Sequence, residues 1–337
     1  MGKNLVNILS IALIYCGAVF GAGFASGREI FSFFSCYKMG GIVASVFAGF
    51  LFSFFGYVVS KYAKVNNIRN AEEYFCHLFP KCVAKVFSFI ANSFLMLSFC
   101  IMITGCGALF SEQFGVAPVM GALLSLVICF LVIKNDVSGL EAFNFLATPF
   151  MFIGVVILCG LCMCLPKTTP LESTELVTPA VSGLLYISYN MVSAVAVLIS
   201  AAKIAKTPRQ AGWGGAAGGM LIALPLVLMS VVLAYHWEVA SLPLPFFGLV
   251  YNNFPFLSII CAIVLYFAMM TTAVSSGVAV IAGVAPKNSG KYAFLLCVLA
   301  LVLSFIPFAT LVQTVYSAFG FIGVALIAGI FIKILRK

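Results

Sequence analysis

The sequence predicts an all-α integral membrane protein with ten transmembrane helices, and three observations lead to this fold class. Of the 337 residues, 64% are hydrophobic and only 8% are charged, whereas a soluble domain carries about 25% charged residues. The few charges divide the chain into neutral stretches that are long enough for one helix each, since a span needs about 20 apolar residues. The basic residues, finally, gather in every second connection between these stretches.

The predicted spans follow from the neutral stretches in order. Two long neutral runs need dividing: Pro307 separates the last two spans, and the proline- and asparagine-rich segment 241–255 is expected to be a loop with a short surface helix. The hydrophilic connection 61–85 is expected to carry a short amphipathic helix that begins near Asn70. The ten spans are expected at residues 4–27, 39–60, 86–111, 113–133, 142–166, 176–202, 210–237, 256–285, 291–306 and 309–332.

The net charge of +9 is explained by the orientation of these spans. With the N-terminus inside, the outer segments hold only Arg28, Lys38 and Lys167, and the other fifteen basic residues lie on the inner side. This is the bias described by the positive-inside rule. The sequence therefore predicts a multi-pass protein of the cell membrane, embedded in the lipid bilayer, with both termini in the cytoplasm and with no nucleic acid as partner.

Ten helices can form two repeats of five. Because five is odd, the second repeat starts on the opposite side of the membrane, which gives the inverted repeat of many secondary transporters. We predict a first repeat at 1–165 and a second, inverted repeat at 176–337, within a single integral membrane domain. In such proteins the substrate site lies near the midplane, where the first helix of each repeat is broken. Helices 1 and 6 are therefore expected to be discontinuous.

Span 1 contains a cluster of glycines that favours such a break. Each glycine costs about 1 kcal/mol in a helix interior, so several of them together favour unwinding. The alternative explanation for the cluster is close packing of helices through small residues. Charged residues follow at once at positions 28 and 29, and a helix that restarts there would turn its N-terminal amides inward. We expect the backbone to be non-helical between about Phe20 and Ser26. The glycines are Gly17, Gly21, Gly23 and Gly27.

Spans 6 and 8 place polar side chains inside apolar runs, where unpaired polar groups are costly and often functional. In span 6, Asn190 lies about ten residues from the start, whereas Tyr186 also fits an aromatic belt at the outer interface. In span 8, three hydroxyls at spacing i, i+3 and i+4 share one face. Such oxygens suit a cation like Na⁺, unless each hydroxyl bonds back to the carbonyl of residue i−4. The three are Thr272, Ser275 and Ser276.

Together these stretches resemble the five-plus-five inverted-repeat transporters typified by LeuT, the superfamily of amino acid, polyamine and organocation carriers. The string Gly-Ala-Gly-Phe-Ala-Ser-Gly-Arg-Glu-Ile from Gly21 and the Tyr-x-x-Tyr-Asn stretch from Tyr186 resemble its YkvI-like branch. The resemblance implies a secondary active transporter of an amino acid or related small organic solute, working by cation-coupled alternating access. A non-transporting, ligand-sensing receptor on the same fold is the alternative.

The resemblance also implies the residues of the site. The backbone from Gly21 to Ser26 would bind the charged head group of the substrate, and the chain from Tyr186 to Asn190 would close the other side. A Na⁺ site would use the carbonyls of Gly17, Phe20 and Thr272 and the hydroxyls of Ser275 and Ser276. The expected substrate-binding residues are Gly21, Ala22, Gly23, Phe24, Ala25, Ser26, Tyr186, Tyr189 and Asn190.

Three features limit the chemistry further. Ala18 stands where the sodium-coupled pattern often has a polar residue, so a second Na⁺ site is not expected. No acidic residue lies in spans 1, 6 or 8 as delimited above, which disfavours a metal-ion carrier; coupling to H⁺ would need a peripheral group such as Glu112 or Glu141. No span pairs a nucleophile with a base or holds two carboxylates, so we expect neither an enzyme nor a cofactor other than the coupling ion.

Overall fold

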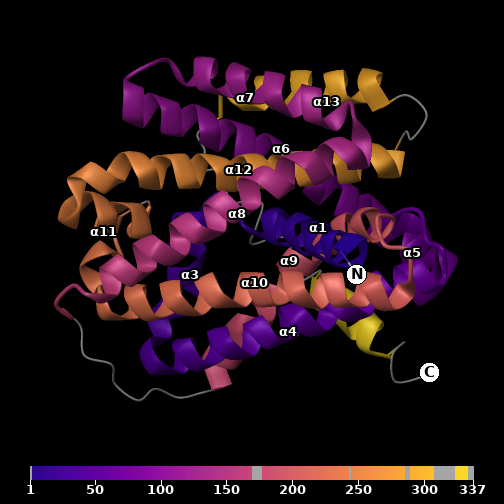
Figure 1. Cartoon of the computed structure of the whole chain (residues 1–337), viewed down its shortest axis with the longest axis horizontal. Helices are drawn as coiled ribbons and strands as arrows, with labels where there is room; N and C mark the ends of the chain where they lie inside the picture. Colours follow the sequence, from indigo (N-terminus) through magenta and orange to yellow (C-terminus); the bar gives the residue numbers. More distant parts are fainter. Residues whose placement is uncertain (1, 169–176, 243, 285–288, 307–322, 333–337) are drawn as a thin grey trace.

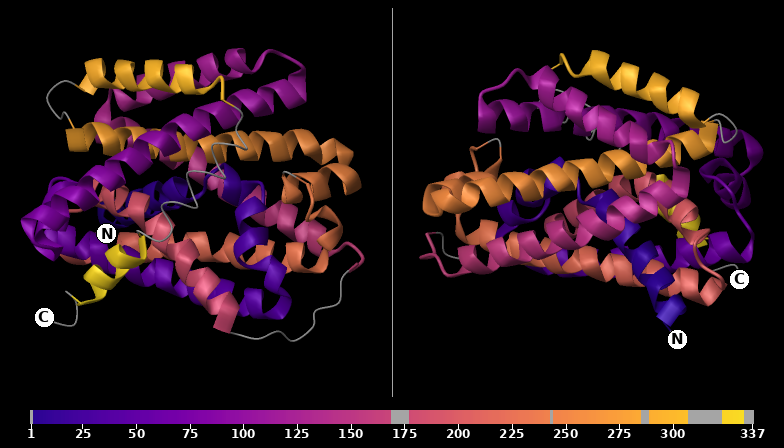
Figure 2. Two further views of the ribbon diagram at one scale, coloured as in Figure 1. Left: turned by 180° about the vertical axis from the view of Figure 1, so that it is seen from behind. Right: turned by 45° about the horizontal axis from the view of Figure 1, so that its top comes forward.

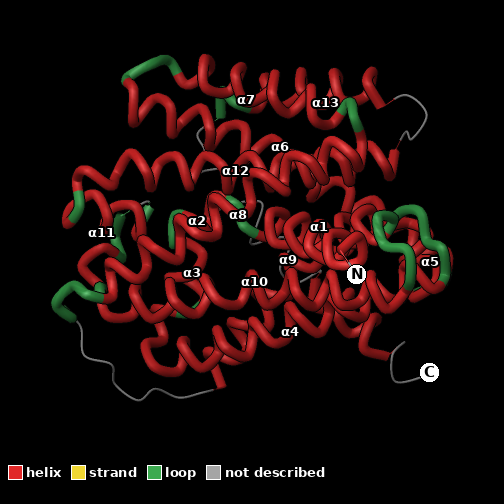
Figure 3. The backbone as a smooth tube through the Cα atoms, in the orientation of Figure 1, coloured by secondary structure: helices red, strands yellow, loops and turns green. Residues whose placement is uncertain are grey.

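A computed structural model gives the architecture of the chain and describes residues 2–168, 177–242, 244–284, 289–306 and 323–332. Within these ranges the chain is built from helices and loops without a strand (Figure 3). Helices satisfy every backbone N–H and C=O group within one segment, which is what a lipid environment demands of apolar runs such as these. The predicted all-α membrane fold is confirmed.

The first half of the chain begins with a short, interrupted helix and continues with long ones. Its helices are α1 (Gly2–Val19), α2 (Ala22–Ala25), α3 (Arg28–Phe33), the 3-10 turn η1 (Ser35–Tyr37), α4 (Lys38–Val65), α5 (Ala71–Leu78), α6 (Lys81–Phe114), α7 (Pro118–Ile133) and α8 (Asp136–Met163). The second half contains α9 (Val177–Ala202), α10 (Pro208–Tyr235), η2 (Trp237–Val239), α11 (Pro245–Asn253), η3 (Pro255–Leu257), α12 (Ser258–Val284) and α13 (Ser289–Leu303). A last helix covers Gly323–Ile332.

An apolar helix lies at the position of each predicted span. Six helices are long and apolar enough to cross a membrane, and four shorter ones cover Asn4–Val19, Pro118–Ile133, Gly290–Leu303 and Gly323–Ile332. The short helices predicted outside the spans are present too: α5 is capped by the Asn70 side chain, which accepts from the backbone N–H of Glu73 at 2.9 Å, and α11 lies in the proline-rich loop. The number of ten crossings stays a prediction, and residues 309–322 of the tenth span lie outside the described residues.

The helices are arranged around α1 and α9. Figure 1 shows α7 and α13 along one edge of the molecule and α4 and α10 along the opposite edge, and both views of Figure 2 keep α13 away from α10. Every residue from 10 to 27 is buried, as is every residue from 186 to 202. Other helices therefore enclose the first helix of each predicted repeat, and they enclose residues 268–281 of α12 in the same way.

α4 and α10 touch through their backbones. A Cβ atom added to Gly215 would lie 2.0 Å from the carbonyl oxygen of Gly56, and one added to Gly56 would lie 2.4 Å from that of Gly215. Small residues permit such close approach between membrane helices. α1 packs on the same pair, because a Cβ on Gly218 would lie 2.8 Å from the Tyr15 ring, and the Tyr15 hydroxyl donates to the carbonyl of Phe52 at 3.1 Å.

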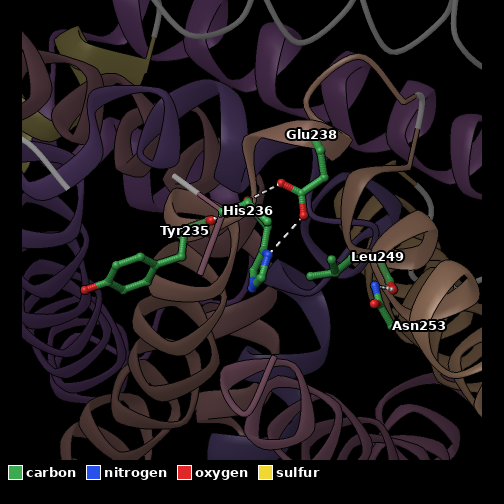
Figure 4. Close-up of polar contacts among 6 residues, drawn as sticks. Tyr235, His236, Glu238, Leu249 and Asn253 are labelled. Atoms are coloured by element: carbon green, nitrogen blue, oxygen red, sulfur yellow. Dashed lines mark hydrogen bonds and ion pairs between the residues drawn. The ribbon is translucent and has the colours of Figure 1, made fainter. Parts of the chain in front are cut away.

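The chain after α8 is tied to the end of α10. Figure 4 shows His236 and Glu238 directly after α10, with Nδ1 of His236 3.0 Å from Oε1 of Glu238. The Thr168 hydroxyl lies 2.9 Å from the Tyr235 carbonyl and also contacts the Glu238 carboxylate. Burial raises the pKa of Glu238, but hydrogen bonds from Thr168, the backbone and His236 outweigh it, so this pKa lies below its ordinary value. The neighbouring pocket of about 280 Å³, lined in part by His236 and Lys167, contains none of the predicted site residues.

The predicted orientation can be measured directly. Green fluorescent protein fused after Lys337 is expected to fluoresce and alkaline phosphatase fused there is expected to be inactive, because the distribution of basic residues places the C-terminus in the cytoplasm. Active phosphatase at this position would contradict the predicted orientation. If the N-terminus were also shown to be cytoplasmic, it would contradict the five-plus-five arrangement too, since an even number of spans returns the chain to the side on which it started.

Candidate substrate and cation site

The first helix is interrupted inside the bundle, as predicted. α1 ends at Val19, the residues Phe20 and Gly21 are not helical, and α2 begins at Ala22. The amide of Gly21 bends back to the Val19 carbonyl at 2.9 Å. The amide of Ala22 finds only the thioether sulfur of Met102, at 3.4 Å, which is a weak acceptor. The break therefore leaves backbone groups of span 1 without their regular helical partners.

A second interruption follows one turn later, at Ser26 and Gly27. Gly27 has φ of 78°, in the left-handed region that favours glycine. Between the two breaks, the amides of Ala25 and Ser26 donate to the carbonyls of Gly21 and Ala22, both at 2.9 Å. These two bonds close a single helical turn. The expectation of a non-helical backbone throughout Phe20–Ser26 is therefore wrong for Ala22–Ala25.

The carbonyls next to the first break point towards α12. The Thr272 hydroxyl lies 3.0 Å from the Gly17 carbonyl oxygen and 2.9 Å from that of Phe20. A hydroxyl has one hydrogen, so it fully satisfies only one of the two acceptors at a time. The structure thus brings three of the predicted cation ligands together, but it is the hydroxyl of Thr272 that meets span 1, whereas the resemblance implied its carbonyl.

Ser275 and Ser276 continue this face of α12 and are 0% and 2% exposed. The hydroxyl of Ser275 has no hydrogen-bond partner among the residues that the structure describes. A buried hydroxyl left in this way costs about 1–3 kcal/mol. The alternative in which each hydroxyl bonds back to its own helix therefore does not apply to Ser275.

α8 adds two polar side chains that the sequence reasoning missed. A Cβ on Gly17 would lie 2.2 Å from Oδ1 of Asn144 and 2.8 Å from Oγ1 of Thr148, and the Thr148 hydroxyl donates to the Leu13 carbonyl at 3.2 Å. Gly17 is therefore a close-packing glycine, as the alternative reading of the glycine cluster proposed. Both side chains stood in the sequence as polar residues within span 5, but nothing there indicated that they face α1.

α9 is not interrupted, so the predicted break in helix 6 is wrong. The helix runs from Val177 to Ala202 without a gap. Its polar side chains bond to its own turns: the amide of Asn190 donates to the Tyr186 carbonyl at 2.9 Å, and the Ser188 hydroxyl donates to the Leu184 carbonyl at 2.7 Å. Its one proline, Pro179, lies in the first turn, where proline is tolerated. The rest of the helix contains a single glycine and therefore has little reason to unwind.

Tyr186 lies in an aromatic cluster and not in an interfacial belt. Its side chain is 0% exposed. Its ring centroid lies 5.4 Å from that of Phe33, 5.0 Å from that of Phe34 and 6.0 Å from that of Phe52. These rings come from α3, the turn after it, and α4. They pack against the middle of α9, so Tyr186 is positioned by the two helices that follow the interruption.

Glu29 is the main feature that the sequence reasoning missed. Its side chain is 9% exposed, and its carboxylate accepts a hydrogen bond from the Tyr189 hydroxyl. A Cβ on Gly23 would lie 1.9 Å from its Oε1. One carboxylate therefore contacts both stretches expected to bind substrate. The sequence analysis placed Glu29 outside span 1, because each span was defined as a neutral stretch and therefore ended before the first charged residue.

The surroundings of Glu29 contain no basic partner. Within the described ranges, no Lys, Arg or His lies at ion-pair distance from its carboxylate. The adjacent Arg28 is exposed and its guanidinium donates to the carbonyls of Ala240 and Leu242 at 3.0 and 3.4 Å. No group of three or more His, Cys, Asp or Glu side chains suited to a metal ion occurs in the described part of the chain.

Two proteins of Bacillus subtilis (strain 168) are similar to this chain over almost its whole length. The membrane protein YkvI is 24% identical over 342 residues, which cover 99% of this chain and 98% of YkvI. The protein YyaD is 24% identical over 328 residues, which cover 94% of this chain and 93% of YyaD. No family model matches the sequence.

Several solved transporter structures share the fold. A Na⁺-coupled sialic acid symporter, in a substrate-bound outward-open state, superposes with a TM-score of 0.68 at 13% identity, over 97% of this chain and 79% of the symporter. The nucleobase-cation-symport-1 family transporter MHP1 superposes with a TM-score of 0.63 at 12% identity, over 91% of this chain and 74% of MHP1. The Eremococcus coleocola manganese transporter superposes with a TM-score of 0.61 at 13% identity, over 90% of this chain and 70% of the transporter. The chain is thus a multi-pass membrane protein with the LeuT-like transporter fold.

Proposed function

We propose that this protein is a secondary active transporter that moves an amino acid or related small organic solute by alternating access, coupled to a monovalent cation, with Na⁺ as the first candidate. The substrate would bind at α2 and the facing part of α9, and the cation would bind between α1 and α12. The chain would lie in the cell membrane with both termini in the cytoplasm, built from two inverted repeats at 1–165 and 176–337.

One observation carries the proposal. α1 is broken in the buried centre of the fold, and the carbonyls freed at Gly17 and Phe20 face the hydroxyl of Thr272 on α12. Several neutral oxygens suit a cation that must bind and then leave, because each contributes only weakly. The unpartnered Ser275 hydroxyl supplies a further oxygen on the same face. The alternative of a ligand-sensing receptor has no comparable observation in its favour.

The proposal is tested by transport. The purified protein in proteoliposomes is expected to accumulate a radiolabelled solute from a panel of amino acids when a Na⁺ gradient points inward, and to lose this accumulation when the gradient is collapsed. Accumulation that follows a pH gradient instead would keep the transporter but replace the ion. A panel of small organic solutes that is never accumulated under either gradient would contradict the proposed function.

The cation site makes a separate prediction. The double variant Ser275→Ala/Ser276→Ala removes two of the proposed oxygens without leaving a large cavity, so folding is expected to survive. The Na⁺ concentration needed for half-maximal substrate binding should rise by about tenfold or more, since a polar contact to a charged group is worth about 1.5–3 kcal/mol. Binding to detergent-purified protein is measured across Na⁺ concentrations at fixed ionic strength.

The matched control is Ser88→Ala on α6. The buried hydroxyl of Ser88 donates to the Ala84 carbonyl of its own helix at 2.8 Å. The substitution therefore removes a hydroxyl that has no role in the proposed site. It should leave the Na⁺ dependence unchanged. If the double variant behaves like this control, the hydroxyl face of α12 is ordinary helix packing.

A further inference from the structure

The buried carboxylate of Glu29 has no role in the function proposed above, and its surroundings restrict what the site can hold. We propose that Glu29 binds the positively charged amino group of the substrate, so that this protein selects solutes with an ammonium group and rejects solutes whose only charge is negative. This inference rests on the proposed substrate site, because it assigns the chemistry of one of its walls.

The first argument is position. Glu29 belongs to α3, but its carboxylate lies against Gly23 of α2 on one side and receives the Tyr189 hydroxyl of α9 on the other. A group that joins these two helices lies between the elements through which a bound solute would be held. Its place is therefore the interior of the proposed site and not its rim.

The second argument is charge. A carboxylate taken out of water is costly unless it is paired, and ionisable groups buried in membrane proteins mark substrate or ion pathways. A single phenol donor leaves most of the acceptor capacity of a carboxylate unused, since its two oxygens offer about four sites. An ammonium group has three N–H donors and a positive charge, which matches what Glu29 lacks.

The third argument concerns the neighbouring side chains. Arg28, the nearest basic residue in sequence, is held outside by the carbonyls of Ala240 and Leu242. The ring of Tyr189, whose hydroxyl contacts Glu29, lies 5.8 Å from the ring of Phe33, and aromatic faces attract cations. A solute with only a carboxylate would meet the like charge of Glu29 without a compensating base. The wall of the site is therefore suited to a cation and unsuited to an anion.

The test uses matched sets of solutes that differ only in their charged groups. One set is leucine, 3-methylbutylamine and 4-methylpentanoate; a second is phenylalanine, phenethylamine and 3-phenylpropanoate; a third is alanine, ethylamine and propanoate. Thermal stabilisation of the full-length, detergent-purified protein reports binding without requiring transport, because a ligand that binds only the folded state raises its stability. In at least one set, the amino acid or the amine is expected to stabilise the protein. The acid of the same set, which lacks the amino group, is not expected to stabilise it.

Variants then assign the selectivity to Glu29. Glu29→Gln should weaken binding of the amine-bearing solute by about tenfold or more, which corresponds to loss of a hydrogen bond to a charged group. Glu29→Asp keeps the charge and should bind more tightly than Glu29→Gln. Tyr189→Phe should keep the preference for amines, because the carboxylate remains. Glu72→Gln, which removes an exposed carboxylate on α5, is the matched control and should bind normally.

Three outcomes would overturn the inference. They are stabilisation by acids equal to that by amines, absence of amine-dependent stabilisation in every set, and a folded Glu29→Gln protein that keeps full affinity. If the Glu29→Gln protein keeps full affinity but its substrate binding no longer depends on pH, Glu29 is a proton carrier instead. Failure of the proposed function looks different: amines would stabilise the protein through Glu29, but no solute would accumulate in proteoliposomes.

Discussion

Gly23→Leu is expected to abolish substrate uptake while the protein still folds. Even the first added carbon would lie 1.9 Å from Oε1, 2.4 Å from Cδ and 2.6 Å from Cγ of Glu29. These atoms belong to a side chain, which can rotate away, so the clash need not unfold the bundle. The rotation removes the carboxylate from Tyr189, and the leucine fills the space beside α2. A displacement of about 1 Å in a binding site can cost on the order of a hundredfold in rate.

The measurement is initial uptake in proteoliposomes, with thermal stability and size-exclusion profile as checks on folding. Gly160→Leu is the matched control, because Gly160 is exposed on α8 and a Cβ there meets nothing within 4 Å. The control should transport at the normal rate. If Gly23→Leu also transports normally, the interrupted helix does not hold the substrate.

Gly215→Ala is expected to lower the stability of the folded protein strongly. Its Cβ would lie 2.0 Å from the carbonyl oxygen and 2.4 Å from the carbonyl carbon of Gly56. These are backbone atoms of α4, so relief requires the two helices to move apart. Overpacking usually costs about 1–3 kcal/mol and occasionally more, and a contact between two backbones belongs at the upper end of that range.

The variant should show a lowered melting temperature and a reduced yield of monodisperse protein. Gly290→Ala on α13 provides the comparison, since a Cβ at that position meets nothing within 4 Å. It should melt like the unchanged protein. An unaltered melting temperature for Gly215→Ala would mean that α4 and α10 adjust to the added carbon at little cost.

Much of the fold could be predicted from where the sequence has no charge. Long neutral runs can satisfy their backbone only as helices in lipid, and within the described residues an apolar helix lies at the position of each predicted span. The break at Phe20 and Gly21 followed from the glycine cluster, because several helix-weakening residues near one another lower the cost of a gap. These features depend on local composition, which a sequence shows directly.

The parts that could not be predicted depend on the partners of individual side chains. The inverted-repeat arrangement implied a break in α9, but the side chains of Asn190 and Ser188 bond to carbonyls of their own helix, which stays continuous. Glu29 is buried because α3, which begins directly after the second break, packs against α9 and α10. A method that ends each span at a charge cannot find a buried charge, so the most informative residue of the site fell just outside the predicted span.

The backbone contact between Gly56 and Gly215 also has a consequence for how the protein is made. α4 is synthesised long before α10, and until α10 is inserted its glycine face has no partner that fits this closely. Small-residue faces of membrane helices gain their stability by packing against another helix. The part of the chain from α1 to α8 is therefore expected to remain incomplete on the ribosome, and its stable form to appear only after α10 has entered the bilayer.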